Sequence, residues 1–395
     1  MSRPTETDVP RFSVVVPTRD RPDLLDFCLE SLSRQTFDDF EVIVSDNPTE
    51  ASAQEVFERW AGERWRYTSP DGGVPMHENF EHGCAEATGE YVAVVIDKTV
   101  LHPSALELVA RALSGQETVD IVTWWNEGYN PIDELNDVRV GRFLPVATIA
   151  EPSLYDPAAE LARRFANAER RGVDEIHYVR GKIVFGAYSR ALLARIREVT
   201  GRVFQPLAPD YTAMVPACAL ARDALDVGRP LLISYNSCRS NGRRQAVDAS
   251  HARRFIEAVD PAIVDALPIA GLYSSHHNVV AYDLVSSARR CPEGTTPELD
   301  LANLTRRARE DLGAVIWDDP RERDDQYRIL QAAEEQSGIT PVSTARGPSL
   351  TDLLGRISPL RQLAARRHPP PPAYASPLEA ARVAERHYAV SAKTS

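Results

Sequence analysis

The sequence predicts an α/β fold in which helices cover both faces of a mostly parallel sheet, followed by a mainly helical C-terminal region. Short apolar runs such as VVV at 14–16 alternate with amphipathic segments through the N-terminal part of the chain. Such alternation implies parallel strands joined by helices. After Arg239 the strand patterns become rare, and helix patterns dominate residues 249–337.

The opening segment gives the clearest example. The run at 14–16 is β-branched and ends at Pro17, as expected for a buried strand. Pro22 then suits the first turn of a helix. The apolar residues that follow recur at helical spacing and share one face: Leu25, Cys28, Leu29 and Leu32.

The same rules place the other elements. We expect strands at 40–45, 64–68, 91–96, 119–125, 183–187 and 231–235. We expect helices at 53–61, 76–87, 189–199 and 209–221, and one more that opens at Pro103. Residues 126–158 are rich in Pro, Asp and Asn and predict an irregular loop.

These patterns divide the chain into three parts. Residues 10–242 carry the predicted sheet, residues 243–340 form a helical region, and residues 341–395 form a basic, Pro-containing tail. Residues 338–348 resemble a linker. A basic, partly amphipathic stretch follows at 349–366, and a last short helix is expected near 378–388.

Composition limits the partners and the location. The net charge of -12 argues against nucleic acid as the main partner. The five cysteines form no CxxC pair, the N-terminus is polar, and no apolar run could span a bilayer. We therefore expect a cytoplasmic protein. The basic tail is a candidate for contact with the inner face of a membrane, or else packs on the acidic sheet domain.

Three predicted strands end in polar residues. These ends are Pro17-Thr18-Arg19, Asp46-Asn47 and Asp97-Lys98-Thr99. Because the carboxyl ends of parallel strands form the ligand crevice of an open α/β sheet, the three ends predict one site.

Two longer segments carry a family resemblance. FSVVVPTRDRPDLLDFCLESLSRQTFDDFEVIVSD at 12–46 and NFEHGCAEATGEYVAVVIDKTVLHP at 79–103 together resemble glycosyltransferase family 2, whose members have the GT-A fold. The resemblance is good over residues 12–103 and continues more weakly to about residue 242.

The resemblance implies a nucleotide-diphosphate sugar as donor substrate, UDP-linked in our interpretation. Pro17, Thr18 and Arg19 match the loop that holds the base, and Asp46 matches the carboxylate that contacts the uracil or ribose. A carboxylate suits this role because it accepts charge-assisted hydrogen bonds. The structural alternative for Asp46 is a turn cap. Asn79 lies in the matching segment that precedes the family's metal motif, and we place it in the donor site.

The chain departs from the family at that metal motif. Where the family has Asp-x-Asp, this chain has Asp97 and Thr99 with Lys98 between them. In our preferred interpretation the Lys98 ammonium neutralises the diphosphate, so that Mg²⁺ or Mn²⁺ contributes weakly or is dispensable. Alternatively, Asp97 still holds a metal ion with help from a distant histidine, His276 or His277. In the third interpretation Lys98 only points into solvent.

The acceptor side rests on the resemblance as well. Asp210 in LAPDYTAM matches the position of the general base of inverting members, while its structural alternative is a helix N-cap. Residues 177–190 resemble the segment beneath the donor sugar. Gly181, Lys182 and His177 are the candidates there for contact with the donor sugar or the acceptor.

The resemblance thus implies an inverting glycosyltransferase that uses a hydroxyl of a glycan, a lipid-linked molecule or a small molecule as acceptor. The alternative is a catalytically inactive member that binds a nucleotide sugar or a protein partner. A nucleotide-dependent dehydrogenase is disfavoured, because the first strand is not followed by G-x-G-x-x-G. The oligomeric state is not indicated.

Overall fold

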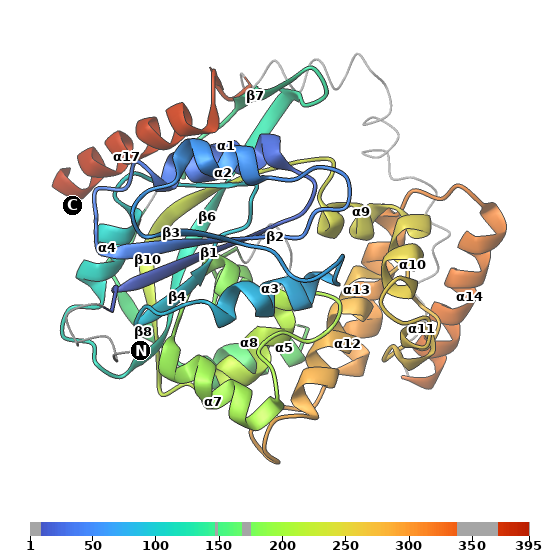
Figure 1. Cartoon of the computed structure of the whole chain (residues 1–395). Coiled ribbons are helices and arrows are strands. Elements are labelled where there is room, and N and C mark those ends of the chain that lie inside the picture. Colours follow the sequence, from blue (N-terminus) through green and yellow to red (C-terminus); the bar gives the residue numbers. More distant parts are fainter. Residues whose placement is uncertain (1–8, 147–148, 168–174, 338–369, 395) are drawn as a thin grey trace.

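A β-sheet runs through the middle of the protein, with helices on both faces (Figure 1). The computed structural model describes residues 9–146, 149–167, 175–337 and 370–394. The strand order along the sheet is β11-β7-β6-β9-β4-β1-β2-β3, and β10 pairs with β5, β6 and β8. The predicted α/β fold of the GT-A type with a helical C-terminal region is confirmed.

The strands are β1 Phe12–Thr18, β2 Phe40–Asp46, β3 Trp65–Thr68, β4 Tyr91–Val94, β5 Thr99–Leu101, β6 Val119–Asp133, β7 Asp137–Arg142, β8 Ser153–Tyr155, β9 Gly186–Ser189, β10 Asp223–Tyr235 and β11 Ala373–Tyr374. Strands β3, β2, β1 and β4 are parallel, and β9 joins them antiparallel. Thr18 pairs with Asp46, so the polar ends of β1 and β2 lie side by side.

The helices of the sheet domain are α1 Pro22–Leu32, α2 Gln54–Trp60, α3 Met76–Ala85, α4 Ala105–Ala112, α5 Pro157–Phe165, α6 Glu175–Val179, α7 Arg190–Thr200 and α8 Pro209–Leu220. After them come α9 Asn241–Val247, α10 Ala249–Glu257, α11 Ile263–Ala266, α12 His276–Ala288, α13 Leu301–Ala314, α14 Pro320–Gln336 and α17 Pro377–Thr394. Figure 1 shows α1 and α2 above the sheet and α3, α7 and α8 below it.

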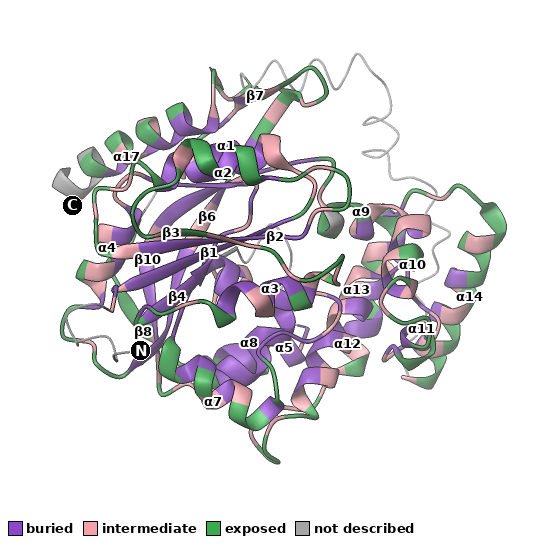
Figure 2. Cartoon of the chain, viewed as in Figure 1, coloured by how far each residue is buried: buried purple, intermediate pink, exposed green. Residues whose placement is uncertain are grey.

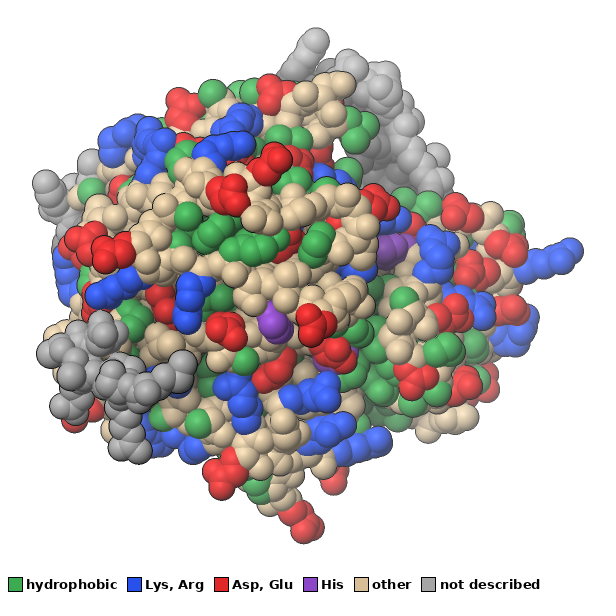
Figure 3. Space-filling model, viewed as in Figure 1, with side chains coloured by type: hydrophobic (Ala, Val, Ile, Leu, Met, Phe, Trp, Pro, Cys, Tyr) green, Lys and Arg blue, Asp and Glu red, His purple; other side chains and the backbone are tan. Residues whose placement is uncertain are grey.

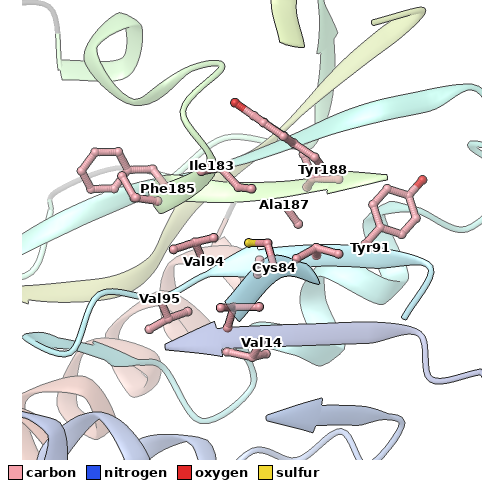
Figure 4. Packing of buried hydrophobic residues seen from close by; sticks show 14 of the residues in the cluster. Val14, Cys84, Tyr91, Val94, Val95, Ile183, Phe185, Ala187 and Tyr188 are labelled. Carbon is pink, nitrogen blue, oxygen red and sulfur yellow. The ribbon is translucent and has the colours of Figure 1, made fainter. Parts of the chain in front are cut away.

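The main hydrophobic core lies on both faces of the sheet, against α1 and α2 on one side and against α3, α7 and α8 on the other. Cys84 of α3 packs toward Val14 of β1 and Val94 of β4, with Tyr188 of β9 nearby (Figure 4). At Gly83, one residue earlier, a Cβ atom would come within 2.7 Å of Val15 Cγ1, so a glycine lets the helix lie close to the sheet. Figure 2 shows the central strands as buried and the outer face of α14 as exposed.

The predicted strand at 183–187 is wrong in its first half. Ile183–Phe185 is a 3₁₀-helix, and the strand begins at Gly186. An apolar run of this length does not by itself distinguish a strand from a helical turn. A Cβ at Gly186 would lie 2.0 Å from the carbonyl oxygen of Val122, so only a glycine can lie this close to β6 at the start of the strand.

The predicted irregular segment at 126–158 is also corrected. Strand β6 continues to Asp133 and forms a hairpin with β7, and β8 adds a short edge to β10. Strand β10 itself starts at Asp223, earlier than the predicted 231–235. Its first half was missed because Gly228, with φ +76°, and Pro230 mark a register shift within the strand.

Helix α17 returns to the sheet domain. Leu378, Ala384 and Tyr388 on α17 are buried in a second core with Tyr129 of β6 and Tyr235 of β10. The Tyr388 hydroxyl donates to the buried carboxylate of Glu127, which also lies 3.1 Å from His102 Nε2. Part of the predicted tail therefore packs on the sheet.

The domain boundaries at 242 and 340 stay predictions. The linker-like stretch at 338–348 and the basic stretch at 349–366 lie outside the described residues. Among the described residues, no helix has the length and apolar character needed to cross a membrane. Figure 3 shows basic and acidic side chains interspersed over the face that it draws.

Candidate functional site

A cavity of about 330 Å³ opens beside the carboxyl ends of β1 and β2. Its walls come from the loop after β1, from α3, from the starts of α8 and α9, and from α12. The predicted site residues that line it are Pro17, Thr18, Arg19, Asn79, Lys98, Asp210 and His276. Those that do not line it are Asp46, Asp97, His177, Gly181, Lys182 and His277.

The loop after β1 is held by Asp20, a residue that the sequence analysis did not single out. Its carboxylate accepts from the backbone N–H groups of Thr49, Glu50 and Ala51 at 2.8–3.0 Å and also from the Thr49 hydroxyl. Desolvation opposes ionisation, but these hydrogen bonds outweigh it and lower the pKa of Asp20 far below its usual range. Asp20 therefore fixes the β1–α1 loop against the β2–α2 loop.

Asp46 lies just behind the cavity wall. Its Oδ2 accepts from the Ala53 N–H at 2.7 Å and from the Tyr67 hydroxyl at 2.6 Å, while its buried Oδ1 has no hydrogen-bond partner among the described residues. Burial, then the hydrogen bond to Asp46, raises the pKa of Tyr67 to about 12. The next residue, Asn47, lines the cavity and exchanges hydrogen bonds with the backbone of Val74.

Asn79 joins the ends of the first two strands. Its side-chain oxygen accepts from the Ser45 hydroxyl at 2.7 Å, and its Nδ2 donates to the carbonyl oxygens of Thr18 and Ser45. Asn79 thus reaches the cavity from a buried position on α3 and fixes the strand ends around it.

Asp97 is fully buried beneath the cavity. Its Oδ2 lies 3.0 Å from Arg21 Nε and accepts from the Thr18 hydroxyl at 2.9 Å, while Oδ1 has no hydrogen-bond partner among the described residues. Burial raises the pKa of Asp97, and the charges of Arg21 and Lys98 together with the Thr18 hydrogen bond oppose that rise. Arg21 itself lines the cavity.

These residues do not fit a divalent cation. A hard cation needs several oxygen ligands, most of them anionic. Asp97 is already engaged by Arg21, and the Thr99 hydroxyl donates to the Ile96 carbonyl at 2.6 Å. The described residues contain no group of three or more His, Cys, Asp or Glu side chains that could hold a metal ion. Lys98 stands at the middle position, and its Nζ donates to Ser240 Oγ at 2.9 Å.

Asp210 lies in the first turn of α8 and faces the cavity. Its Oδ2 is 3.5 Å from the ammonium of Lys182, whose side chain is fully buried. That ammonium also lies 3.8 Å and 3.6 Å from the ring centroids of Tyr178 and Tyr211. A buried cation held by two aromatic faces and one carboxylate places a fixed positive charge behind Asp210.

Gly181 and His177 lie away from the cavity. Gly181 has φ +78°, and a Cβ there would come within 2.8 Å of Cys218 Sγ on α8. A glycine is therefore required where this turn packs against the helix that carries Asp210. His177 Nδ1 lies 3.0 Å from Glu160 Oε2 on α5.

The two adjacent histidines of α12 have separate partners. His276 lines the cavity, and its Nδ1 pairs with Gln245 Oε1. His277 Nδ1 lies 2.9 Å from Asp311 Oδ1 on α13.

Asp283, a fully buried residue of α12 that lines the cavity, was not predicted from the sequence. Its Oδ2 accepts from the Ala208 N–H at 3.1 Å, and its Oδ1 has no hydrogen-bond partner among the described residues. Burial raises the pKa of Asp283 well above its usual range; the Ala208 N–H opposes this and the charge of Asp210 adds to it. The only sequence signal is one aspartate inside the apolar run VVAYDLV. Arg21 was also missed, although it directly follows the motif Thr18-Arg19-Asp20.

Comparison with known proteins gives a partial match. Residues 13–139 match the family model described as Glycosyl transferase family 2. Two curated relatives, both called validoxylamine A glucosyltransferase, come from Streptomyces hygroscopicus subsp. jinggangensis (strain 5008) and subsp. limoneus. Each is 31% identical over 127 residues, which is 31% of this chain. The match spans only 30% and 28% of the length of these relatives.

Solved structures are similar over a longer part of the chain. S. aureus TarS 1-349 in complex with UDP-GlcNAc has a TM-score of 0.48 and 14% identity, covering 84% of this chain and 93% of that one. Mannosyltransferase PcManGT from Pyrobaculum calidifontis in complex with GDP-Man and Mn2+ has a TM-score of 0.39 and 18% identity, covering 85% and 89%. The sequence match includes the strands that form the β1 and β2 end of the cavity, and residues 13–139 are therefore similar to glycosyl transferase family 2.

Proposed function

We propose that this protein transfers a sugar from a nucleotide-diphosphate sugar, UDP-linked, to an acceptor hydroxyl with inversion. One observation carries the proposal: a single cavity joins the loop of Pro17, Thr18 and Arg19 to Asp210 at the start of α8. The match of residues 13–139 to glycosyl transferase family 2 supports a nucleotide-sugar donor at the Pro17-Thr18-Arg19 end of the cavity. The carboxylate at the other end supports an acceptor beside it.

In the proposed reaction Asp210 takes the proton of the acceptor hydroxyl. The acceptor oxygen then forms a bond to the anomeric carbon on the face opposite the diphosphate, and the bond from that carbon to the diphosphate oxygen breaks. The electron pair of the broken bond leaves with the nucleoside diphosphate. The Lys182 ammonium lies 3.5 Å from Asp210 Oδ2 and orients the carboxylate for this step.

The donor nucleotide is proposed to lie against Pro17, Thr18, Arg19 and Asn79, with Asp46 as the carboxylate for the uracil or ribose. With a UDP-linked donor, the name of the curated relatives makes UDP-glucose the first donor to test and validoxylamine A the first acceptor. The wider acceptor classes are glycans, lipid-linked molecules and small molecules.

The experiment is Asp210→Asn, which keeps the shape of the side chain and removes its basicity. General-base catalysis contributes roughly 10²- to 10⁴-fold to rate. We expect a loss of UDP release within that range, measured with UDP-glucose and validoxylamine A, while the affinity for UDP is retained. Turnover within about threefold of the wild type would rule out Asp210 as the base, because that margin lies well below the usual contribution.

A second candidate function is a catalytically inactive protein that binds a nucleotide sugar or a protein partner. The changed metal motif, with Lys98 and a hydrogen-bonded Thr99, favours this alternative. The inactive protein would bind UDP-glucose in calorimetry but release no UDP in the presence of any acceptor from a panel of sugars and polyols.

Weak dependence on divalent metal is a separate part of the proposal. The leaving diphosphate needs positive charge, and Lys98 supplies an ammonium where the family has a metal-binding motif. Activity should therefore persist in EDTA, and Lys98→Ala should lose rate that added Mn²⁺ does not restore. Loss of turnover in EDTA with full recovery by Mn²⁺ would support a metal held by Asp97 with His276 or His277.

Contact of the basic tail with an anionic membrane is the last part of the proposal. Truncation of the chain after Thr344 is not a suitable test, because it would also remove α17, which packs on the sheet. Membrane contact is tested instead in the full chain, with Arg356, Arg361, Arg366 and Arg367 changed to Gln. Equal flotation of this variant and the wild type with anionic liposomes would refute membrane contact.

A further inference from the structure

Arg21 stands where the chain leaves the loop after β1 and enters α1. Its side chain is 24% exposed and lines the cavity, although one edge of its guanidinium is fixed from below. That edge is Nε, which lies 3.0 Å from Asp97 Oδ2. Arg21 thus connects a fully buried carboxylate with the ligand space above it.

The other edge of the guanidinium remains available. Among the described residues, Nη1 and Nη2 of Arg21 have no hydrogen-bond or ion-pair partner. These two nitrogens carry four of the five N–H donors of the group, in a planar fork that matches two oxygens of a phosphate. A guanidinium held through Nε by a buried anion is therefore oriented before any ligand arrives.

The support below Arg21 is rigidly built. Asp97 is fully buried and accepts from Thr18 on the same oxygen that faces Arg21. On the chain, Arg21 directly follows Asp20, whose carboxylate holds three backbone N–H groups of the neighbouring loop. Both contacts restrict the loop, so little conformational entropy remains to be lost when Arg21 binds a ligand.

The charges around the cavity indicate an anion at this end. Arg19 and Lys98 line the cavity together with Arg21, whereas its lining carboxyl groups, Asp210 and Asp283, lie on α8 and α12. An anion at the β1 end would meet three basic side chains. The neutral or hydroxyl-bearing part of the same ligand would extend toward Asp210.

We propose that Arg21 binds the diphosphate of the donor through Nη1 and Nη2, with Asp97 as its buried counter-ion. In this chain the aspartate that the family uses for a metal ion then orients a guanidinium instead. The inference rests on the proposed nucleotide-diphosphate donor, and it adds Arg21 to Lys98 as a second cation for the diphosphate.

The test is calorimetry with UDP and with uridine, both in EDTA, on the wild type, Arg21→Gln and Arg21→Lys. Loss of a charge-assisted contact should weaken UDP binding by roughly 10- to 100-fold in Arg21→Gln. Arg21→Lys keeps the charge but loses the fork, so an intermediate loss is expected. Uridine has no phosphate, and its affinity should be the same in all three proteins.

Two further variants control the test. Arg59→Gln removes another surface arginine that pairs with an aspartate, Asp26, outside the cavity, and should bind UDP like the wild type. Asp97→Asn keeps the shape of the counter-ion but removes its charge, and should weaken UDP binding in EDTA as Arg21→Gln does. Thermal melts of each variant report whether the fold is intact.

The outcomes separate this inference from the proposed function. UDP affinity in a folded Arg21→Gln equal to that of the wild type overturns the role of Arg21 alone; if that variant does not fold, equal affinity in Arg21→Lys has the same force. A wild type that binds no UDP, GDP or ADP overturns the donor assignment and this inference together. A wild type that binds UDP through Arg21 but transfers no sugar supports the inference and refutes only the transferase.

Discussion

The two ends of the cavity are built in different ways. At the β1 and β2 end, Asp20, Asp46 and Asp97 each receive two or more hydrogen bonds or ion pairs from the protein. At the α8 end, Asp283 accepts one backbone hydrogen bond at Oδ2 and Asp210 faces one lysine at 3.5 Å. The first end uses its carboxylates to hold loops in shape. The second keeps Asp283 buried with a single hydrogen bond, and burial raises the pKa of this carboxyl group.

This difference teaches where stability and chemistry are separated in the molecule. Substitutions at the first end should change the fold or the binding of the nucleotide, and those at the second should change turnover or the pH dependence of stability. Sites that carry reactive groups commonly lower stability, whereas supporting residues raise it.

After Asp210→Asn, the largest effect should come from Lys182→Met, which keeps the length of the side chain but removes its charge. The ammonium orients the Asp210 carboxylate from between the rings of Tyr178 and Tyr211. Misplacement of a reacting group costs on the order of 10²-fold in rate. We expect a loss of about that size in UDP release, with UDP affinity unchanged in calorimetry. An equal fall in UDP affinity would show that Lys182 serves both ends of the cavity.

At the opposite end, Asp46→Ala should weaken UDP binding by roughly 1.5–3 kcal/mol, the range for a hydrogen bond to a charged group. The residue lies at a strand end, so the fold should survive. Calorimetry with UDP provides the measurement. Unchanged affinity would mean that Asp46 only supports Asn47, and that the Ala53 and Tyr67 contacts are its whole function.

Asp20→Ala should lower the free energy of unfolding by roughly 1–2 kcal/mol, as the loss of a strong cap does. Because the folded pKa of Asp20 is lowered, its contribution is present above the unfolded pKa and disappears as the pH falls through the folded pKa. Chemical denaturation at neutral and acid pH measures the loss in the free energy of unfolding and its pH dependence. Asp71→Ala is the control at an exposed aspartate. A difference that grows on acidification would contradict the role of the ionised carboxylate.

Asp283→Asn should have the opposite sign, a gain in the free energy of unfolding at neutral pH. The folded pKa of Asp283 is raised, so the wild type loses stability as the pH rises from the unfolded pKa toward the folded one. The asparagine has no such titration. The gain should therefore vanish below about pH 4, where both states bind the proton. A variant less stable than the wild type at neutral pH would show that the carboxyl group supports the fold.

The first half of the fold could be predicted because its signals are local. The run at 14–16, Pro22 and the helical spacing of Leu25 and Leu29 define β1 and α1 without reference to the rest of the chain. The errors came where distant contacts decide. Gly186 starts a strand because β6 lies against it. Strand β10 contains a register shift around Gly228, and the local sequence there is typical of a turn.

The same limit applies to the site. Polar residues at strand ends pointed to Thr18, Arg19 and Lys98, and these line the cavity. Asp283 could not be found in this way, because its importance comes from the packing of α12 on α8, far apart in the sequence. The ion pair of Arg21 with Asp97 likewise joins two segments whose pairing no local pattern specifies.

Helix α17 has a consequence for how the protein is made. Its side chains complete a core with Tyr129 and Tyr235, and its tyrosine hydroxyl satisfies the buried Glu127. All other strands of this core except β11 are synthesised before residue 236. During translation, the apolar face around Tyr129 and Tyr235 and the Glu127 carboxylate are therefore exposed until α17 is synthesised. Exposed surface of this kind favours aggregation. Chaperone demand should thus peak after the strands are finished and end only when α17 docks.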